Sequence, residues 1–234
     1  FPEDQIYVLL ENKFRESYFK HVKENFGTWD KTANLLQLSR TVLIQYSQGK
    51  RWIPLKVLNI LSKTTKLDLT TIEKHVISYR PYHGKSVKKP KIPILESPEL
   101  LRILIHMIAD GYTTLDKRIQ SNYTNTNYTL IKNLTNYIQR VFGAINLTET
   151  RDKRFNAWSI GIPKVIVYLV NHFYKINFRN PRLPEIFWNL PKEYTFSILG
   201  AFIDDEGSIS ESSIDISSSN SPLLTDLKNL LVEK

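Results

Sequence analysis

Two apolar segments that fit helices each end in an acidic residue followed by glycine, at Asp110-Gly111 and at Glu206-Gly207, 96 residues apart. Carboxylates at a helix C-terminus are disfavoured by some tenths of a kcal/mol to about 1 kcal/mol each, because that end of the helix dipole is negative. The run Asp204-Asp205-Glu206 therefore opposes folding preference. A single Asp-Gly is ordinary turn chemistry, but two such ends in register constrain the fold strongly.

An internal repeat accounts for this spacing. The same shift of 96 residues carries Lys132-Asn133-Leu134 onto Lys228-Asn229-Leu230. In each copy a short polar stretch that favours strands, 112–125 or 208–219, lies between these anchors and is followed by an apolar helical stretch. Only four residues follow Leu230, so we expect the second copy to be truncated.

The two acidic helix ends predict a metal site. Side-by-side packing of the helices would bring Asp110 and Glu206 together, and Gly200-Ala201 supplies small residues for close packing. Two carboxylates at close range repel unless a hard cation lies between them, and Mg²⁺ binds to few carboxylates while it keeps several waters. Such a metal can activate water and stabilise the leaving oxygen of a phosphodiester. We therefore expect Asp110 and Glu206 to bind Mg²⁺ or Mn²⁺ and to be catalytic.

The two segments resemble the paired signature helices of the LAGLIDADG homing endonucleases. The clearer match is Leu199-Gly200-Ala201-Phe202-Ile203-Asp204-Asp205-Glu206-Gly207, and the looser one runs from Ile103 to Gly111, with bulky residues where the family prefers small ones. The resemblance covers about residues 98–234. It implies a duplicated αββαββα domain with the signature helices at a pseudo-twofold interface and a saddle of antiparallel strands in the DNA major groove. It also implies that Asp110 and Glu206 bind the metals that cut both strands.

The predicted fold class is α+β. We expect an all-α helix-turn-helix bundle at residues 1–78, opened by an amphipathic helix from Pro2 to about Phe26. A basic, Pro-rich, extended linker is expected at 79–97, a first LAGLIDADG-like repeat at 98–180 and a truncated second repeat at 181–234. Because prolines cannot lie in helix interiors, we expect this Pro-rich segment to be extended and not helical.

Residues 29–48 fit the spacing of a helix-turn-helix. Ala33 lies where the second helix must approach, Ser39 is the expected N-cap of that helix, and Gln37 stands where a turn glycine is usual. The segment resembles the bihelical DNA-binding unit of many repressors. A small helical bundle without DNA contact is the alternative.

The charge balance points to double-stranded DNA as the partner. The formal net charge is +9, with 32 Lys+Arg against 23 Asp+Glu, which suits a polyanion. The predicted contacts are basic, amide and hydroxyl side chains that can reach phosphates or base edges. They are Arg40, Thr41, Gln45, Gln48, Lys50 and Arg51 in the N-terminal module, Lys85, Lys88 and Lys89 in the linker, and Lys117, Arg118, Gln120, Asn122, Lys153 and Arg154 in the first repeat, where Thr113 and Asn125 offer similar donors.

Other classes of protein fit poorly. The chain has no cysteine, which removes disulfides and thiolate sites and fits a reducing compartment. Its apolar stretches fall short of the roughly 20 residues that span a bilayer. The five histidines show no metal-ligand spacing, and we interpret His106 as a helix-packing residue. These features predict a soluble intracellular protein, in the cytoplasm or nucleoid, that acts as a pseudo-twofold monomer.

The leading functional hypothesis is a site-specific, Mg²⁺-dependent double-strand endonuclease. The alternative is a transcription regulator that binds DNA through the same saddle without cutting it. A nuclease remnant with an intact fold and no activity is a third possibility that the sequence does not separate from the regulator. Retention of Asp110 and Glu206 favours cleavage, because carboxylates beside phosphates repel them.

Overall fold

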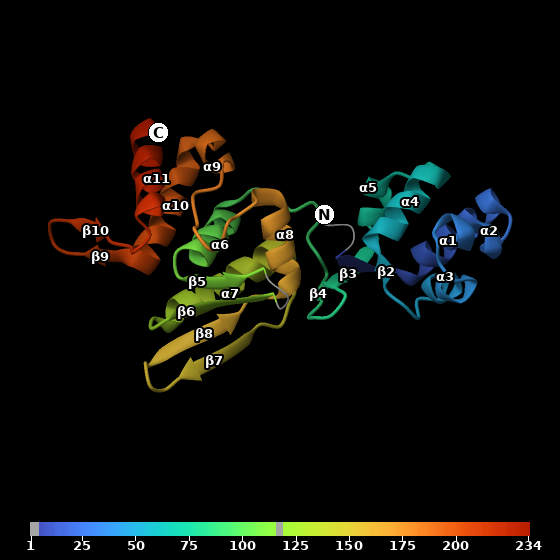
Figure 1. Ribbon diagram of the computed structural model, residues 1–234, viewed down its shortest axis with the longest axis horizontal. Coiled ribbons are helices and arrows are strands. Elements are labelled where there is room, and N and C mark those ends of the chain that lie inside the picture. Colours follow the sequence, from blue (N-terminus) through green and yellow to red (C-terminus); the bar gives the residue numbers. More distant parts are fainter. Residues whose placement is uncertain (1–4, 116–118) are drawn as a thin grey trace. The chain divides into compact units, whose positions relative to one another are not determined.

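The computed structural model describes residues 5–115 and 119–234, so the predicted contacts Lys117 and Arg118 lie outside the described residues. The chain divides into two compact units, Phe1–Ile92 and Pro93–Lys234. Both units combine helices with antiparallel strands, and the protein is of the α+β class (Figure 1).

The first unit contains a four-stranded antiparallel sheet in the order β2-β1-β3-β4. Its strands are β1 (Ile6–Leu10), β2 (Ile53–Pro54), β3 (Val76–Pro81) and β4 (Val87–Lys88), and its helices are α1 (Asn12–Phe26), α2 (Trp29–Leu35), α3 (Arg40–Ser47), α4 (Leu55–Thr65) and α5 (Leu69–Glu73).

The all-α expectation for residues 1–78 is wrong. Ile6, Val8 and Leu10 are buried and alternate with more exposed neighbours along β1, and the helix expected from Pro2 begins only at Asn12. A short apolar run does not reveal by periodicity whether it forms helix or strand, since its pairing partners lie elsewhere in the chain.

The expected linker also contributes strands to this sheet. Pairing of β3 with β1 and of β4 with β3 uses residues up to Lys88. Pro81 stands at the end of β3, opposite Ile6, where its ring breaks the strand least. The basic, Pro-rich segment therefore completes the first unit over most of its length instead of leaving it.

The helix pair expected between residues 29 and 48 is present as α2 and α3. Ser39 caps α3, with its Oγ accepting a hydrogen bond of 3.3 Å from Val42 N. Gln37, in the turn, has a φ of 53°, the left-handed conformation that explains why glycine is usual there. The buried Arg15 of α1 donates to Ser47 O at 3.2 Å and so ties the end of α3 to α1.

The second unit begins with helix α6 (Pro98–Ile108), which is capped by Ser97 and has Pro98 in its first turn. The elements that follow are β5 (Gly111–Thr114), β6 (Gln120–Asn125), α7 (Tyr128–Phe142), β7 (Thr148–Asp152), β8 (Ala157–Gly161), α8 (Lys164–Tyr174), α9 (Ile186–Asn189), α10 (Lys192–Glu206), β9 (Gly207–Ile209), β10 (Ile214–Ile216) and α11 (Ser221–Glu233).

One four-stranded antiparallel sheet, in the order β5-β6-β8-β7, lies in the first part of this unit. Helices α6, α7 and α8 pack against it (Figure 1). Along β6, Ser121 and Tyr123 are buried, whereas Gln120, Asn122 and Thr124 are exposed. The sheet therefore has one face in the core and one open, polar face.

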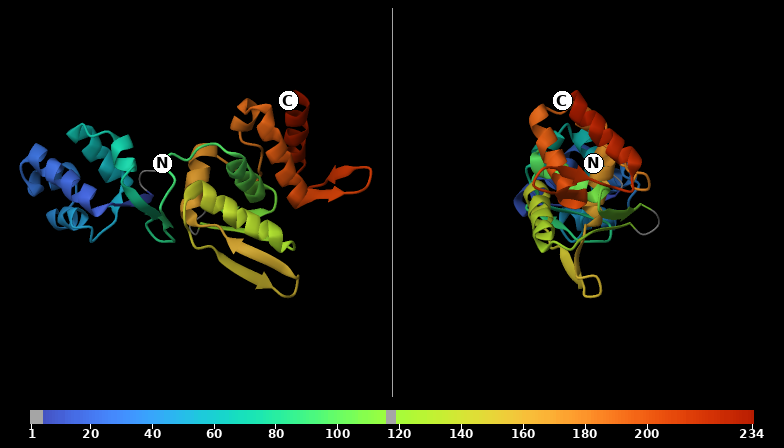
Figure 2. Two further views of the ribbon diagram at one scale, coloured as in Figure 1. Left: turned by 180° about the vertical axis from the view of Figure 1, so that it is seen from behind. Right: turned by 90° about the vertical axis from the view of Figure 1, so that its left-hand side faces the viewer.

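The order α6-β5-β6-α7 recurs as α10-β9-β10-α11. The second hairpin is a separate two-stranded sheet that projects from the end of α10 (Figure 2). Its paired residues Ile209 and Ile214 are 70% and 58% exposed. These two apolar side chains are thus uncovered among the described residues.

Glycine begins the strand that follows each acidic helix end. Gly207 begins β9 directly after α10, and Gly111 begins β5 two residues after the end of α6. A Cβ at Gly111 would lie 2.3 Å from Met107 O, and a Cβ at Gly207 would lie 2.4 Å from Ile203 O. The same steric constraint, four residues back along the helix, applies in both copies.

The two copies do not stay in register beyond the hairpin. The N-caps of α7 and α11 are Asn127 and Asn220, so Lys132 is the fifth residue after its cap and Lys228 the eighth. The shift of 96 residues thus holds at the helix ends but becomes 93 at the caps, because the second hairpin is three residues shorter. The Lys-Asn-Leu match does not join equivalent positions.

We predict that Gly111→Ala and Gly207→Ala each lower the free energy of unfolding by about 1–3 kcal/mol, the range of overpacked sites. Gly161→Ala is the matched control, because a Cβ there would lie 3.6 Å from Asn122 Oδ1 in ordinary contact. Urea denaturation measures the difference. Equal effects at all three positions would contradict the steric argument.

Candidate functional site at the acidic helix ends

Helices α6 and α10 pack against each other, and the acids of the candidate site lie in the last turn of α10 and two residues beyond the end of α6. α6 is buried over most of its surface, with Arg102 as its partly exposed member within the helix body. Ile198, Ala201 and Phe202 of α10 are fully buried. The expected side-by-side packing of the two helices is present.

Gly200 of α10 makes room for an arginine. A Cβ at Gly200 would lie 2.6 Å from Arg102 Nη2, and Arg102 Nη1 donates to Asp204 Oδ2 at 2.8 Å. The small residue thus admits a guanidinium group across the helix interface. The first acid of the run 204–206 is paired in this way.

Asp205 is the buried acid of the site. Its side chain is 0% exposed, and that of His106 is 1% exposed. Asp205 Oδ2 lies 2.8 Å from His106 Nδ1, and Asp205 Oδ1 accepts a hydrogen bond of 2.6 Å from the Tyr123 hydroxyl. Burial, and next the charge of Asp205, raise the pKa of Tyr123 well above its usual value, so the hydroxyl stays protonated and donates.

The first predicted ligand, Asp110, lies beside these groups. Its burial, followed by the charges of Asp205 and Glu206, raises its pKa to about 7, while His106 and a hydrogen bond from Asn125 oppose the rise. Carboxylates gathered without a counter-ion behave in this way. The structure therefore brings the two predicted ligands Asp110 and Glu206 into electrostatic contact.

The donor set fits a hard divalent cation. Asp110 and Glu206 are partly exposed, and Glu206 Oε1 accepts from Ser218 Oγ at 3.0 Å. Asp205 has both oxygens engaged within the protein, so it is not available as a ligand. Among the described residues no group of three or more His, Asp or Glu has a metal-binding arrangement, but Mg²⁺ is often held by one or two carboxylates with waters and substrate phosphate.

The sequence does not predict the network around Asp205. His106, expected to be a helix-packing residue, is buried in the packed interior, and its partner there is a buried acid. His106 and Asp110 are four residues apart, a spacing that places side chains on one face of a helix, although α6 ends at Ile108 and Asp110 lies two residues beyond it. Nothing in the sequence pointed to Tyr123, because the register of the hairpin decides its place.

The predicted DNA contacts in the first repeat differ in their exposure to solvent. Gln120 and Asn122 are exposed on the open face of β6, and Lys153 and Arg154 are exposed in the turn between β7 and β8. Arg154 is paired with Asp152, 2.8 Å apart. The expectation for Thr113 is wrong, since its side chain is buried and shares a hydrogen bond of 2.7 Å with Ser121.

In the first unit the predicted contacts lie on α3, directly after it, and in the segment 85–89 around β4. Arg40 forms an exposed ion pair with Asp30 at 3.5 Å. Of the other predicted contacts, Gln45 is partly exposed and Thr41, Gln48, Lys50, Arg51, Lys85, Lys88 and Lys89 are exposed.

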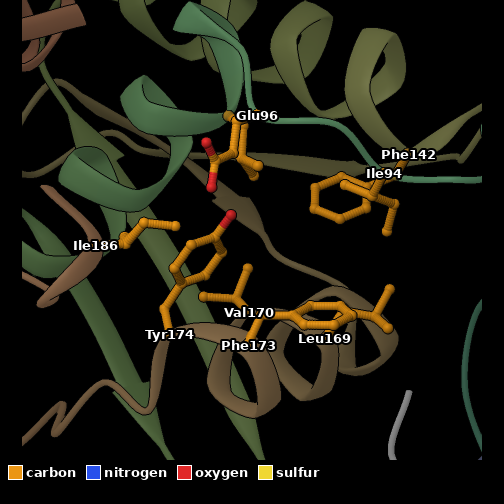
Figure 3. A pocket seen from close by; sticks show the side chains of 9 residues that line it. Ile94, Glu96, Phe142, Leu169, Val170, Phe173, Tyr174 and Ile186 are labelled. Carbon is orange, nitrogen blue, oxygen red and sulfur yellow. The ribbon is translucent and has the colours of Figure 1, made fainter. Parts of the chain in front are cut away.

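A separate apolar cavity of about 220 Å³ lies between α8, the start of α6 and α9. Apolar side chains line most of it, and the Tyr174 hydroxyl points toward Glu96 (Figure 3). Burial, and next the charge of Glu96, raise the pKa of Tyr174 to about 12. The cavity shares no lining residue with the acidic helix ends.

Comparison of the sequence with protein-family models and with curated proteins gives no match. Within residues 5–115 and 119–234, helices of the length and hydrophobicity needed to cross a membrane are not found.

We predict that Asp110→Asn stabilises the metal-free protein at high pH. The raised pKa of Asp110, about 7 against 3.8, means that stability from its protonated form is complete below pH ~4 and is lost as the pH rises through 7. Because the group is only partly buried, we expect a gain of about 1–2 kcal/mol for the variant at pH 8 in EDTA.

Chemical denaturation of both proteins at pH 4 and pH 8 measures this gain. The exposed acid Asp215 of the same unit gives the control Asp215→Asn, which should not reproduce it. An Asp110→Asn variant that is less stable than the wild type at pH 8 would contradict the electrostatic account.

Proposed function

We propose that this chain binds double-stranded DNA site-specifically and cleaves it as a divalent-metal-dependent endonuclease of the LAGLIDADG homing type. The observation that carries the proposal is the packing of α6 against α10, with Asp110 and Glu206 at their ends. Each helix then continues through glycine into the first strand of a hairpin. This is the arrangement that two metal-binding acids at a helix interface require.

The order of elements supports the same proposal. From α6 to α8 the second unit runs αββαββα, and from α10 to α11 it runs αββα. The first order of elements is the one that the resemblance implies for a single repeat, and the second repeats its first four elements. The antiparallel sheet β5-β6-β8-β7 has an open polar face, which suits a major groove.

In this proposal the chain's own residues have separate tasks. Asp110 and Glu206 hold Mg²⁺ or Mn²⁺, which when bound activates water and stabilises the leaving oxygen of a phosphodiester. Gln120 and Asn122 present amide groups to base edges. Lys153 and the basic residues of the first unit bind phosphates. Asp205 keeps the helices together and takes no direct part.

A non-cleaving regulator is the second candidate. It is favoured by the helix pair α2–α3, whose second helix has exposed polar residues such as Arg40 and Thr41 that can read DNA without a metal. The acids favour cleavage, because partly exposed carboxylates beside phosphates weaken binding unless a cation is present.

Selection of bound duplexes from a random library in Ca²⁺, followed by transfer of the selected pool to Mg²⁺, tests the proposal. We expect double-strand breaks that disappear in Asp110→Asn and in Glu206→Gln, with binding retained. Selective binding without breaks would favour the regulator. Absence of selective binding would refute both.

The basic residues of the first unit give a further prediction. Substitution of Lys50, Arg51, Lys88 and Lys89 by Gln should reduce the slope of log K against log salt by about 0.9 for each DNA phosphate that the variant no longer neutralises. Exposed Lys192 of the second unit gives the control Lys192→Gln. Fluorescence anisotropy over a salt series measures the slopes, and an unchanged slope would remove these residues from the interface.

A further inference from the structure

We propose that Asp205 is a positioning residue that acts through Tyr123 and Asn125 to hold the Asp110 carboxylate ready for a divalent cation. This inference rests on the proposed function, since it takes Asp110 as a metal ligand. It assigns a task to a buried network that the cleavage chemistry itself does not use.

Hydrogen bonds connect Asp205, Tyr123 and Asn125 in series. The Tyr123 hydroxyl donates to Asp205 Oδ1 at 2.6 Å, and Asn125 Nδ2 donates to the Tyr123 oxygen at 3.3 Å. Asp110 adjoins the end of this series, because the next residue, Gly111, pairs with Tyr123 and the Asn125 side chain opposes the rise in the pKa of Asp110. Each hydrogen bond orients the side chain that donates or accepts the next one.

The orientation of the Asn125 amide is set from its other end. Asn125 Oδ1 accepts a hydrogen bond of 2.8 Å from Asn127 N, so the NH₂ group must face Tyr123 and Asp110. Asn127 is itself the N-cap of α7. The donor that meets Asp110 is therefore held by both the hairpin and the following helix.

The start of the series is held rigidly. His106 contacts Tyr123, with ring centroids 5.2 Å apart, and its Nδ1 lies 2.8 Å from Asp205 Oδ2. His106 Nε2 is buried, and no hydrogen-bond partner for it is found among the described residues. With both its oxygens engaged and its side chain 0% exposed, Asp205 cannot turn to a metal, so it orients its neighbours.

Among the described residues the other helix end lacks the buried part of this network, although Ser218 Oγ donates to Glu206 there at 3.0 Å. At the shift of 96 residues that joins the helix ends, His106 corresponds to Phe202, which is fully buried, and Asp205 corresponds to Ala109. Ile216 pairs with Gly207 as Tyr123 pairs with Gly111. Apolar residues thus replace all three polar groups, and the network acts on Asp110 alone.

Calorimetric titration of the full chain with MnCl₂ tests the inference. Tyr123→Phe removes only the hydroxyl that joins Asp205 to Asn125. We expect the affinity for Mn²⁺ to fall about 10–100-fold, as for other groups that orient metal ligands. Asp110→Asn is titrated alongside and should abolish this binding.

Tyr128→Phe is the matched control. It also deletes a hydrogen bond from tyrosine to a carboxylate in the same sheet, Tyr128 to Glu149 at 3.0 Å, without a link to Asp110. We expect Tyr128→Phe to keep wild-type Mn²⁺ affinity within about twofold and, because its hydrogen bond is exposed, to lose less stability than Tyr123→Phe. A purely structural role of Tyr123 would lower stability in Tyr123→Phe and leave its Mn²⁺ affinity at the wild-type value, as in Tyr128→Phe.

The outcomes separate this inference from the proposed function. If Asp110→Asn abolishes Mn²⁺ binding and Tyr123→Phe binds as the wild type, positioning is refuted and the metal site stands. If Asp110→Asn leaves Mn²⁺ binding intact, the metal site and the positioning role are both refuted. Should Tyr123→Phe not fold, Asn125→Ala at the partly exposed next link replaces it, with the same expected loss.

Discussion

The second unit depends on the burial of α6. All its residues from Leu100 to Ile108 except Arg102 are buried, and the helix contacts α7, α10 and the strands β5 and β6. A helix that is apolar nearly all round needs neighbours on every side. Its two basic side chains, Arg102 and His106, both turn to α10 and meet Asp204 and Asp205 there. The acidic run at the end of α10, which opposes the helix dipole, is therefore explained in large part by the basic groups of α6.

The acids that do not pair with these basic side chains, Asp110 and Glu206, are the candidates for a chemical role. Asp110 carries a raised pKa because burial and two further acids surround it, and groups with perturbed pKa values gather at functional sites. Stability alone would not select this arrangement, since an ionised Asp110 is disfavoured in the folded protein. Residues that lower the stability of the folded protein are expected at sites where function determines the choice of residue.

The helices of the second unit could largely be predicted from the sequence. Ser97 with Pro98 and Asn127 mark true helix starts, because caps and apolar periodicity are local signals. β1 was misread as helix, since a five-residue strand is defined by partners distant in the chain. Thr113 was placed on the wrong face for a similar reason. The burial of a strand residue depends on where the helices lie, and neighbouring sequence does not reveal that.

The sequence predicts only part of the candidate site. It points to Asp110 and Glu206, because an acid before glycine is visible in the sequence. Asp205 adjoins Glu206, yet its different task follows from contacts with His106 and Tyr123 that only the fold creates. The register of each hairpin fixes these contacts, and a change of three residues between the two hairpins is invisible to a search for a constant repeat spacing.

The unequal surroundings of the two helix ends also determine which helices can pair. Two copies of α6 placed face to face would bury two His106 side chains with no acid between them, and two copies of α10 would bury two Asp205 carboxylates without a base. Either like pair leaves buried polar groups unsatisfied, which is strongly unfavourable. The network thus makes the unlike pair the stable one and disfavours exchange of like helices between two molecules.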